Sequence, residues 1–259
     1  MTGLLFDLDG VLYNSEEPIQ GASKALEWVR EHKIPHLFVT NTTSRSRATI
    51  AAKLNRFGIA AGENDILSPP LAAAAWLRRN SAAGPVALFV RDATRPDFEG
   101  LALVPEDAER GAAYVVIGDL GTHWDFRTLN RAFRLLHHNP EAQLIALGMT
   151  RYWMAGDGIS LDVAPFVVAL EHATGRKPIV FGKPAANFFQ LAAARLGLPT
   201  QDVLMVGDDI EADVRGAMAA GLKGALVQTG KFRPADLQSD PKPHHVLNSV
   251  ADLPKILVG

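Results

Sequence analysis

Short apolar segments alternate with amphipathic segments along most of this 259-residue sequence. The first cycle runs from the apolar residues 4–6, through a helical pattern at 21–31, to a second apolar segment at 35–40. Short apolar segments are typical of strands buried on both faces, and their alternation with helices indicates a parallel sheet covered by helices. We therefore predict an α/β fold whose main domain is a doubly wound, Rossmann-like parallel sheet.

The alternation is interrupted at Ser68-Pro69-Pro70, which we interpret as a linker. The segment beyond it is long enough for a small domain, and it has apolar strands and helical patterns of its own. The core pattern resumes at 179–181, which we predict to be the next strand of the main sheet. We therefore expect an insertion of one α/β domain into another. The predicted boundaries are 1–68 with 181–259 for the core and 69–180 for the smaller inserted domain.

Composition excludes several classes of function. The net charge is −2, which gives no overall attraction to nucleic acid or to an anionic membrane, so we expect neither as a partner. The absence of cysteine excludes disulfides, thiolate catalysis and zinc-thiolate sites. The richest apolar stretch, from Leu71 to Leu77, is far too short to span a bilayer. A cytoplasmic protein is the expectation that fits these features.

Polar side chains follow the predicted strands of the core. Because ligands bind at the carboxyl ends of the strands in an open parallel sheet, we expect these side chains to form one site. They are Asp7 and Asp9 after the first strand, Thr40 and Asn41 after the second, Lys183 after the strand at 179–181, and Asp208, Asp209 and Asp213 after the strand at 203–206.

Each of these residues also has a purely structural interpretation. Asp7-Leu8-Asp9-Gly10 is a common way to leave a sheet, Thr40 is a possible cap, Lys183 a solvated loop residue and Asp213 a helix-surface charge. Their coincidence at strand ends favours a shared chemical role. Phosphoryl transfer through a carboxylate needs a nucleophile, a general acid–base, donors for the phosphoryl oxygens and Mg²⁺ with oxygen ligands. These residues supply side chains for the first three needs and oxygen ligands for Mg²⁺.

At these residues the sequence resembles a known family. Asp7-Leu8-Asp9-Gly10-Val11, Thr40-Asn41, Gly182-Lys183-Pro184 and Gly207-Asp208-Asp209 with Asp213 are similar, in order and spacing, to the four motifs of the haloacid dehalogenase superfamily of phosphatases. The long insertion resembles the large α/β cap of its nitrophenyl-phosphatase and NagD-like subgroup. Further stretches resemble the phospholysine phosphohistidine inorganic pyrophosphate phosphatases. They are Gly118-Asp119-Leu120-Gly121, Leu129-Asn130-Arg131-Ala132-Phe133, Arg151-Tyr152-Trp153, Pro165-Phe166 and Thr229-Gly230-Lys231-Phe232-Arg233.

The resemblance implies a role for each motif residue. Asp7 would be the nucleophile and a Mg²⁺ ligand, and Asp9 the general acid–base, with its backbone carbonyl a second ligand. Thr40 and Asn41 would bind the transferring phosphoryl group, and Lys183 would neutralise its charge. Asp208 would ligate Mg²⁺. Asp209 and Asp213 would lie behind the ligands and orient metal-bound water or Lys183.

The function expected from these roles is Mg²⁺-dependent hydrolysis of a small phosphorylated metabolite, pyrophosphate or phosphoamino acid through an aspartyl-phosphate. The resemblance also suggests a homodimer formed through the cap. A phosphotransferase or phosphomutase shares the same residues, and a phosphoacceptor signalling protein uses a similar set. A dehalogenase, which lacks an acid–base at position 9, and a non-catalytic phosphate-binding protein fit the motifs less well.

Overall fold

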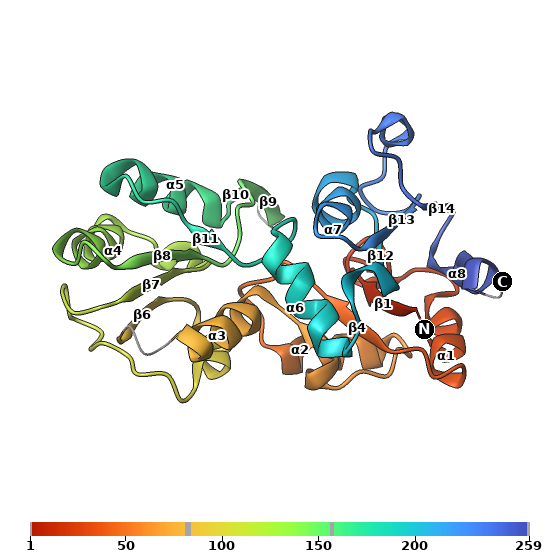
Figure 1. Ribbon diagram of the computed structural model, residues 1–259, viewed down its shortest axis with the longest axis horizontal. Coiled ribbons are helices and arrows are strands. Elements are labelled where there is room, and N and C mark those ends of the chain that lie inside the picture. Colours follow the sequence, from red (N-terminus) through yellow and green to blue (C-terminus); the bar gives the residue numbers. More distant parts are fainter. Residues whose placement is uncertain (1, 81–83, 156–157, 258–259) are drawn as a thin grey trace. The chain divides into compact units, whose positions relative to one another are not determined.

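Six parallel strands, in the order β14-β13-β12-β1-β4-β5, form the sheet on which the N-terminal and C-terminal parts of the chain are built in the computed structural model (Figure 1). The structure describes residues 2–80, 84–155 and 158–257. β1 lies inside the sheet, with β12 on one side and β4 on the other, in registers that pair Leu4 with Leu204 and with His36. The strands are β1 (Gly3–Phe6), β4 (His36–Val39), β5 (Ile66–Leu67), β12 (Val203–Gly207), β13 (Lys223–Val227) and β14 (His245–Leu247).

Helices connect or follow these strands, as the alternation of the sequence predicts. They are α1 (Ala22–Glu31), α2 (Arg47–Arg56), α6 (Ala186–Leu196), α7 (Gly216–Ala219) and α8 (Leu253–Leu257). The chain after β12 begins as a π-helical segment, η6 (Ile210–Arg215), which runs into α7. A small hairpin of β2 (Tyr13–Asn14) and β3 (Glu17–Pro18), which the sequence analysis missed, follows β1.

A second sheet of four parallel strands, in the order β11-β8-β7-β6, is built from the middle of the chain. Its strands are β6 (Val86–Phe89), β7 (Tyr114–Ile117), β8 (Gln143–Ala146) and β11 (Ile179–Val180). Its helices are α3 (Pro69–Asn80), α4 (Phe126–His138) and α5 (Val163–Thr174), and a hairpin of β9 (Tyr152–Ala155) and β10 (Gly158–Leu161) precedes α5. Contacts divide the chain into two units, Met1–Thr40 with Arg47–Leu67 and Lys183–Gly259, and Asn41–Ser46 with Ser68–Gly182.

One expectation about the middle of the chain was wrong. The strand at 179–181 does not join the main sheet, because β11 pairs with β8 of the second sheet. A two-residue apolar strand contains no signal that tells one parallel sheet from another. Ser68-Pro69-Pro70 lies where the chain passes from the first unit to the second, and α3 begins at Pro69. Proline is tolerated in the first turn of a helix, where its missing N–H has no partner to lose.

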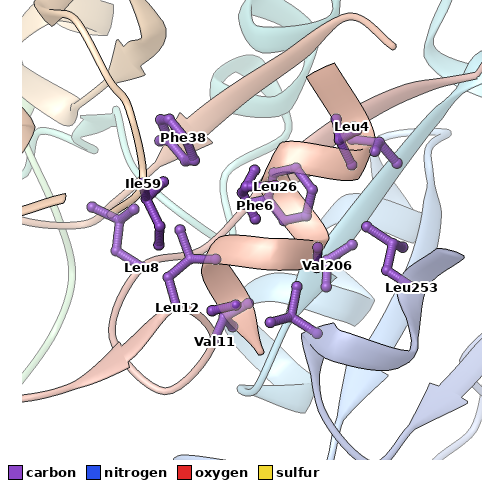
Figure 2. Packing of buried hydrophobic residues seen from close by; sticks show 14 of the residues in the cluster. Leu4, Phe6, Leu8, Val11, Leu12, Leu26, Phe38, Ile59, Val206 and Leu253 are labelled. Carbon is purple, nitrogen blue, oxygen red and sulfur yellow. The ribbon is translucent and has the colours of Figure 1, made fainter. Parts of the chain in front are cut away.

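The main core lies against the sheet of the first unit. Leu4 and Phe6 of β1 are fully buried, and Leu8, Val11 and Leu12 continue the same apolar cluster immediately after the strand. Figure 2 shows these side chains packed with Leu26 of α1 and Val206 of β12. The residues between them, Asp7 and Asp9, are therefore left outside the core. Across the described residues, no helix is both long and apolar enough to cross a membrane.

Removal of two methyl groups from the core strand β13 should cost far more than the same change on the neighbouring β14. Val227 is 0% exposed and belongs to the core cluster, whereas Val246 is 44% exposed. We expect Val227→Ala to lower the free energy of unfolding by about 2 kcal/mol, and Val246→Ala by less than about 0.5 kcal/mol. Urea titrations followed by circular dichroism measure both, and equal losses would contradict the assignment of the core.

Candidate active site

The backbone of β1 holds Asp7 in place. The N–H of Asp7 donates to the carbonyl of Val206 at 3.0 Å, which extends the ladder between β1 and β12 by one residue beyond the strand. The chain then turns, and the N–H of Leu12 donates to the carbonyl of Leu8 at 2.9 Å. Because the turn is anchored by buried Leu8, Val11 and Leu12, the side chain of Asp7 is fixed at the carboxyl end of the sheet.

A buried lysine joins Asp7 to a second carboxylate. Nζ of Lys183 lies 2.5 Å from Oδ1 of Asp7 and 2.7 Å from Oδ1 of Asp213, and Lys183 is only 6% exposed. Burial by itself would lower the pKa of Lys183, but the charges of Asp213 and Asp7 outweigh it, so the pKa lies above the ordinary value. Burial raises the pKa of Asp213, and the Lys183 ammonium opposes that rise. Lys183 is therefore a fixed positive charge beside Asp7.

Asp208, at the end of β12, is held in a space that two glycines leave open. Its Oδ2 accepts the N–H of Lys231 at 2.7 Å. A Cβ atom on either Gly10 or Gly230 would collide with this carboxylate, and both glycines have a positive φ, of 88° and 60°. Burial, followed by the charge of Asp7, raises the pKa of Asp208 to about 6. Its other oxygen, Oδ1, is buried and has no hydrogen-bond partner among the described residues.

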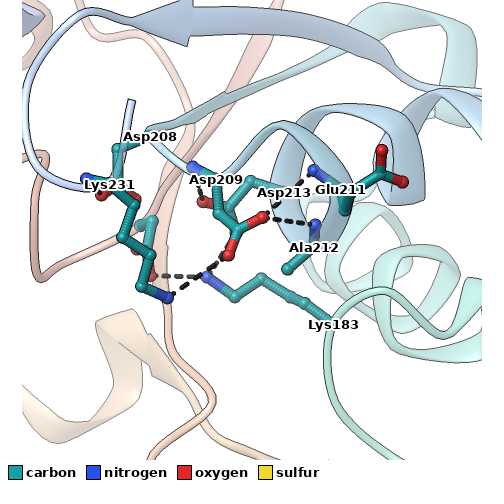
Figure 3. A network of polar contacts seen from close by, with 8 residues as sticks. Lys183, Asp208, Asp209, Glu211, Ala212, Asp213 and Lys231 are labelled. Carbon is teal, nitrogen blue, oxygen red and sulfur yellow. Dashed lines mark hydrogen bonds and ion pairs between the residues drawn. The ribbon is translucent and has the colours of Figure 1, made fainter. Parts of the chain in front are cut away.

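Asp209 and Asp213 lie on either side of the start of η6. The side chain of Asp209 accepts the N–H groups of Glu211 at 3.1 Å and Ala212 at 3.0 Å, which caps this segment. Its Oδ2 also lies 3.3 Å from Nζ of Lys231. Burial would raise the pKa of Asp209, but these donors and the charge of Lys231 bring it below the ordinary value. Figure 3 shows Lys183 and Lys231 reaching into this group of aspartates.

The remaining predicted residues are more dispersed. Asp9 is exposed, and its Oδ1 accepts the N–H of Ser15 at 3.0 Å. Thr40 is buried directly after β4, where its N–H donates to the carbonyl of Leu67 at 3.2 Å. Asn41 follows it in the chain but belongs to the second unit. The first unit therefore brings together Asp7, Lys183, Asp208, Asp209 and Asp213.

Three carboxylates of this group are arranged as metal ligands can be. Asp7, Asp208 and Asp213 each offer one oxygen, and these oxygens lie within 4.8 Å of one another. Four aspartates with two lysines keep a net negative charge, which a divalent cation would neutralise. The unpartnered Oδ1 of Asp208 and the all-oxygen donor set fit such an ion. Asp213 was expected behind the metal ligands, and its carboxylate also holds Lys183.

Sequence reasoning assigned no role to the loop after β13. Thr229 donates its hydroxyl hydrogen to the carbonyl of Gly10 at 2.5 Å, Gly230 gives space to Asp208, and Lys231 contacts both Asp208 and Asp209. The signal was present, because this loop follows the apolar segment 224–227 and strand ends carry ligands in parallel sheets.

Replacing Asp208 by asparagine should stabilise the metal-free protein near neutral pH. The pKa of Asp208, about 6, lies above the ordinary value of an aspartate, so the folded state holds this proton more tightly than the unfolded chain. The carboxylate therefore destabilises the fold above about pH 6. We expect Asp208→Asn to raise the free energy of unfolding at neutral pH by about 1–3 kcal/mol, and the gain to vanish as the pH falls towards about 4.

Asp209→Asn is the matched control, and its effect should have the opposite sign. Because the pKa of Asp209 is lowered, its carboxylate contributes stability above the unfolded pKa, and that contribution is lost as the pH falls. We expect a loss of about 1 kcal/mol or less at neutral pH, since asparagine still caps the helix. Urea titrations in EDTA at neutral and acidic pH test the pair. A loss of stability in both variants at neutral pH would contradict the electrostatic account of Asp208.

Comparisons with known proteins agree with this geometry. Residues 4–103 match the family model described as haloacid dehalogenase-like hydrolase, and residues 180–253 match one described as HAD-hydrolase-like. The chain is 36% identical to phospholysine phosphohistidine inorganic pyrophosphate phosphatase of Xenopus laevis, over 90% of this chain and 85% of that protein. It is 38% identical to haloacid dehalogenase-like hydrolase domain-containing protein 2 of Bos taurus, over 91% and 87%.

A solved structure shares the whole fold. The p-nitrophenyl phosphatase from Archaeoglobus fulgidus has a TM-score of 0.88 and 30% identity, and the match covers 98% of each chain. The doubly wound core with an inserted α/β cap is thus the fold of this protein. Taken with the family models and the similar relatives, these likenesses place the chain in the haloacid dehalogenase superfamily, as one of its phosphatases.

Proposed function

We propose that this protein is a Mg²⁺-dependent phosphatase that works through an aspartyl-phosphate on Asp7. The observation that carries the proposal is the buried Lys183, whose ammonium contacts Oδ1 of Asp7 while Asp208, with an unpartnered oxygen, lies in the same group of carboxylates. A fixed positive charge beside a carboxylate at the end of a parallel sheet suits attack on a phosphoryl group, because it stabilises the charge of the transferring oxygens.

In the first step an oxygen of Asp7 attacks phosphorus, and the bond from phosphorus to the leaving group breaks. Asp9 gives its proton to the leaving oxygen or nitrogen. In the second step the Asp9 carboxylate takes a proton from water, whose oxygen attacks phosphorus. The bond to Asp7 breaks, inorganic phosphate leaves, and both aspartates return to their starting states. Lys183 remains protonated throughout, since its pKa is raised.

Asp7, Asp208 and the backbone carbonyl of Asp9 would hold Mg²⁺. When bound, the ion would neutralise negative charge on the phosphoryl group and on Asp7. We assign Asp213 to holding Lys183, which it contacts at 2.7 Å, and Asp209 to shaping η6, whose first N–H groups it caps. Thr40 and Asn41 would bind the phosphoryl oxygens. Lys231 adds positive charge and fixes Asp208 through its backbone N–H.

We propose that the first unit is the catalytic core and the second is the cap, the roles predicted for residues 1–68 with 181–259 and for 69–180. The cap would select the leaving group and exclude water. The relative from Xenopus laevis is named for phospholysine, phosphohistidine and inorganic pyrophosphate, which makes P–N and P–O–P compounds the first substrates to test. Small phosphate esters come next, because the fold is shared with a p-nitrophenyl phosphatase.

A phosphate-release panel with Mg²⁺ tests the proposal. It should contain pyrophosphate, phosphohistidine, phospholysine, phosphoglycolate, pyridoxal phosphate, small sugar phosphates and 4-nitrophenyl phosphate. We expect turnover of at least one compound, its loss in EDTA, and recovery on adding back Mg²⁺. Asp7→Asn should lower kcat by at least about 10³-fold, because the amide is not a nucleophile. Its unfolding transition should remain cooperative.

Substantial turnover by Asp7→Asn would overturn the assignment of the nucleophile. Full activity in EDTA would overturn the proposed requirement for a metal ion. Transfer of phosphate within a sugar, without release, would indicate a phosphomutase. A phosphorylated protein that persists for minutes after the donor is removed would indicate a phosphoacceptor protein.

We also propose that the β9–β10 hairpin of the second unit mediates a homodimer. In its register Leu161 lies opposite Tyr152, and Ile159 lies two residues from Leu161, so all three side chains share one face. These side chains are 56–71% exposed. An apolar face of this kind on a two-stranded hairpin is typical of a protein-binding surface.

Light scattering should therefore report a dimer for the wild type, and Leu161→Ser should shift it towards monomer. Leu103→Ser is the control, because Leu103 belongs to the same unit and is 43% exposed but lies outside the hairpin. A monomeric wild type, or equal effects of the two substitutions, would contradict this surface.

A further inference from the structure

The β2–β3 hairpin provides the hydrogen bond that orients Asp9. Its strands pair Tyr13 with Pro18 and Asn14 with Glu17, so Ser15 and Glu16 form the two-residue loop. The N–H of Ser15 donates to Oδ1 of Asp9 at 3.0 Å. Asp9 is exposed, and water competes for its oxygens, so its orientation depends on how firmly this loop is held. With Oδ1 bound, Oδ2 is the oxygen that remains to exchange a proton.

The loop itself is in an unfavourable backbone conformation. Ser15 has a φ of +50°, in the left-handed region that residues with a Cβ rarely adopt. Two-residue hairpin loops with a positive φ at the first position usually have glycine there. Such a residue persists only when its surroundings fix it. A contact from outside the hairpin is therefore needed to hold Ser15.

Lys53 of α2 supplies that contact. Its Nζ donates to the carbonyl of Ser15 at 2.5 Å and lies 2.9 Å from Oε1 of Glu16. The ammonium also lies 4.3 Å from the centre of the Tyr13 ring, in a cation–π contact with the first strand of the hairpin. Lys53 is 8% exposed, which is unusual for lysine, and it therefore gives up hydration for these contacts.

The ion pair between Lys53 and Glu16 contributes too little stability to explain why Lys53 is buried. Glu16 is largely exposed and also pairs with the exposed Arg56 at 3.2 Å, and exposed pairs contribute little. The buried ammonium also contacts the backbone carbonyl of Ser15, the residue whose N–H binds Asp9. Lys53 is thus linked through a single residue, Ser15, to Asp9, the proposed acid–base.

We propose that Lys53 is a positioning residue for proton transfer: by holding the Ser15 loop against α2, it keeps the carboxyl of Asp9 turned to the leaving group. The inference rests on the acid–base role proposed for Asp9. A positioning role for Lys53 differs from a purely structural role in one measurable respect. Loss of Lys53 should harm substrates in proportion to their need for a proton on the leaving group, whereas a general loosening of the site should harm all substrates alike.

The test compares kcat/KM for an alkyl phosphate, whose leaving group needs protonation, with that for 4-nitrophenyl phosphate, whose leaving group does not. Well-placed general acids contribute about 10²–10⁴-fold, so partial loss of orientation in Lys53→Met should cost about tenfold on the alkyl ester and less than about twofold on the aryl ester. Lys53→Arg, which keeps a donor, should recover most of the alkyl activity.

Three further variants complete the design. Arg56→Met and Glu16→Gln alter the ion pairs of the hairpin without removing the Lys53 contact to Ser15, and both should keep the wild-type ratio of alkyl to aryl activity. In an Asp9→Asn background, Lys53→Met should cause no further change in that ratio, since both act through one group. Equal losses on both esters, or no loss with Lys53→Met, would overturn the proposal.

The outcome for Asp9→Asn alone separates this inference from the proposed function. A larger loss on the alkyl ester than on the aryl ester supports Asp9 as the acid, and the Lys53 variants then decide the inference. If Asp9→Asn lowers both equally or neither, the acid–base assignment fails, and the positioning role of Lys53 fails with it.

Discussion

The ion pair between Lys183 and two buried carboxylates is the interaction on which the rest of the site depends. An ammonium removed from water is costly unless close opposite charges offset the loss of hydration. Contacts of 2.5 Å to Asp7 and 2.7 Å to Asp213 do so, and they raise the pKa of Lys183. The three residues come from the end of β1, the chain before α6 and the segment η6. Correct formation of the main sheet is thus a condition for a charged lysine beside Asp7.

The position of Asp208 depends on free space around its carboxylate and on a backbone donor. Asp208 occupies room that exists only because positions 10 and 230 have no Cβ, and it receives the N–H of Lys231. Burial beside Asp7 makes its carboxylate unfavourable without a cation, as the raised pKa records. The same repulsion that costs stability without a cation would favour the binding of a divalent ion.

The sequence predicted the parts of this arrangement that follow from strand ends. Asp7 and Asp208 could be placed because β1 and β12 are apolar segments that end at them, and a parallel sheet brings such ends together. The placement of β11 could not be predicted, because two residues, Ile179 and Val180, contain no register signal. The β2–β3 hairpin was missed because Ser15, not glycine, takes the positive φ. The contact of Lys53 spans 38 positions and has no local signature.

Trapping the phosphorylated enzyme tests the central claim most directly. Asp9→Asn should still accept phosphate from 4-nitrophenyl phosphate, whose leaving group needs no acid, but should hydrolyse the aspartyl-phosphate slowly because no base activates water. Acid quenching followed by peptide mass spectrometry should then find a phosphoryl group on Asp7, with one equivalent of 4-nitrophenol released. A burst of 4-nitrophenol with the phosphoryl group on another side chain, or with none on the protein, would contradict the account.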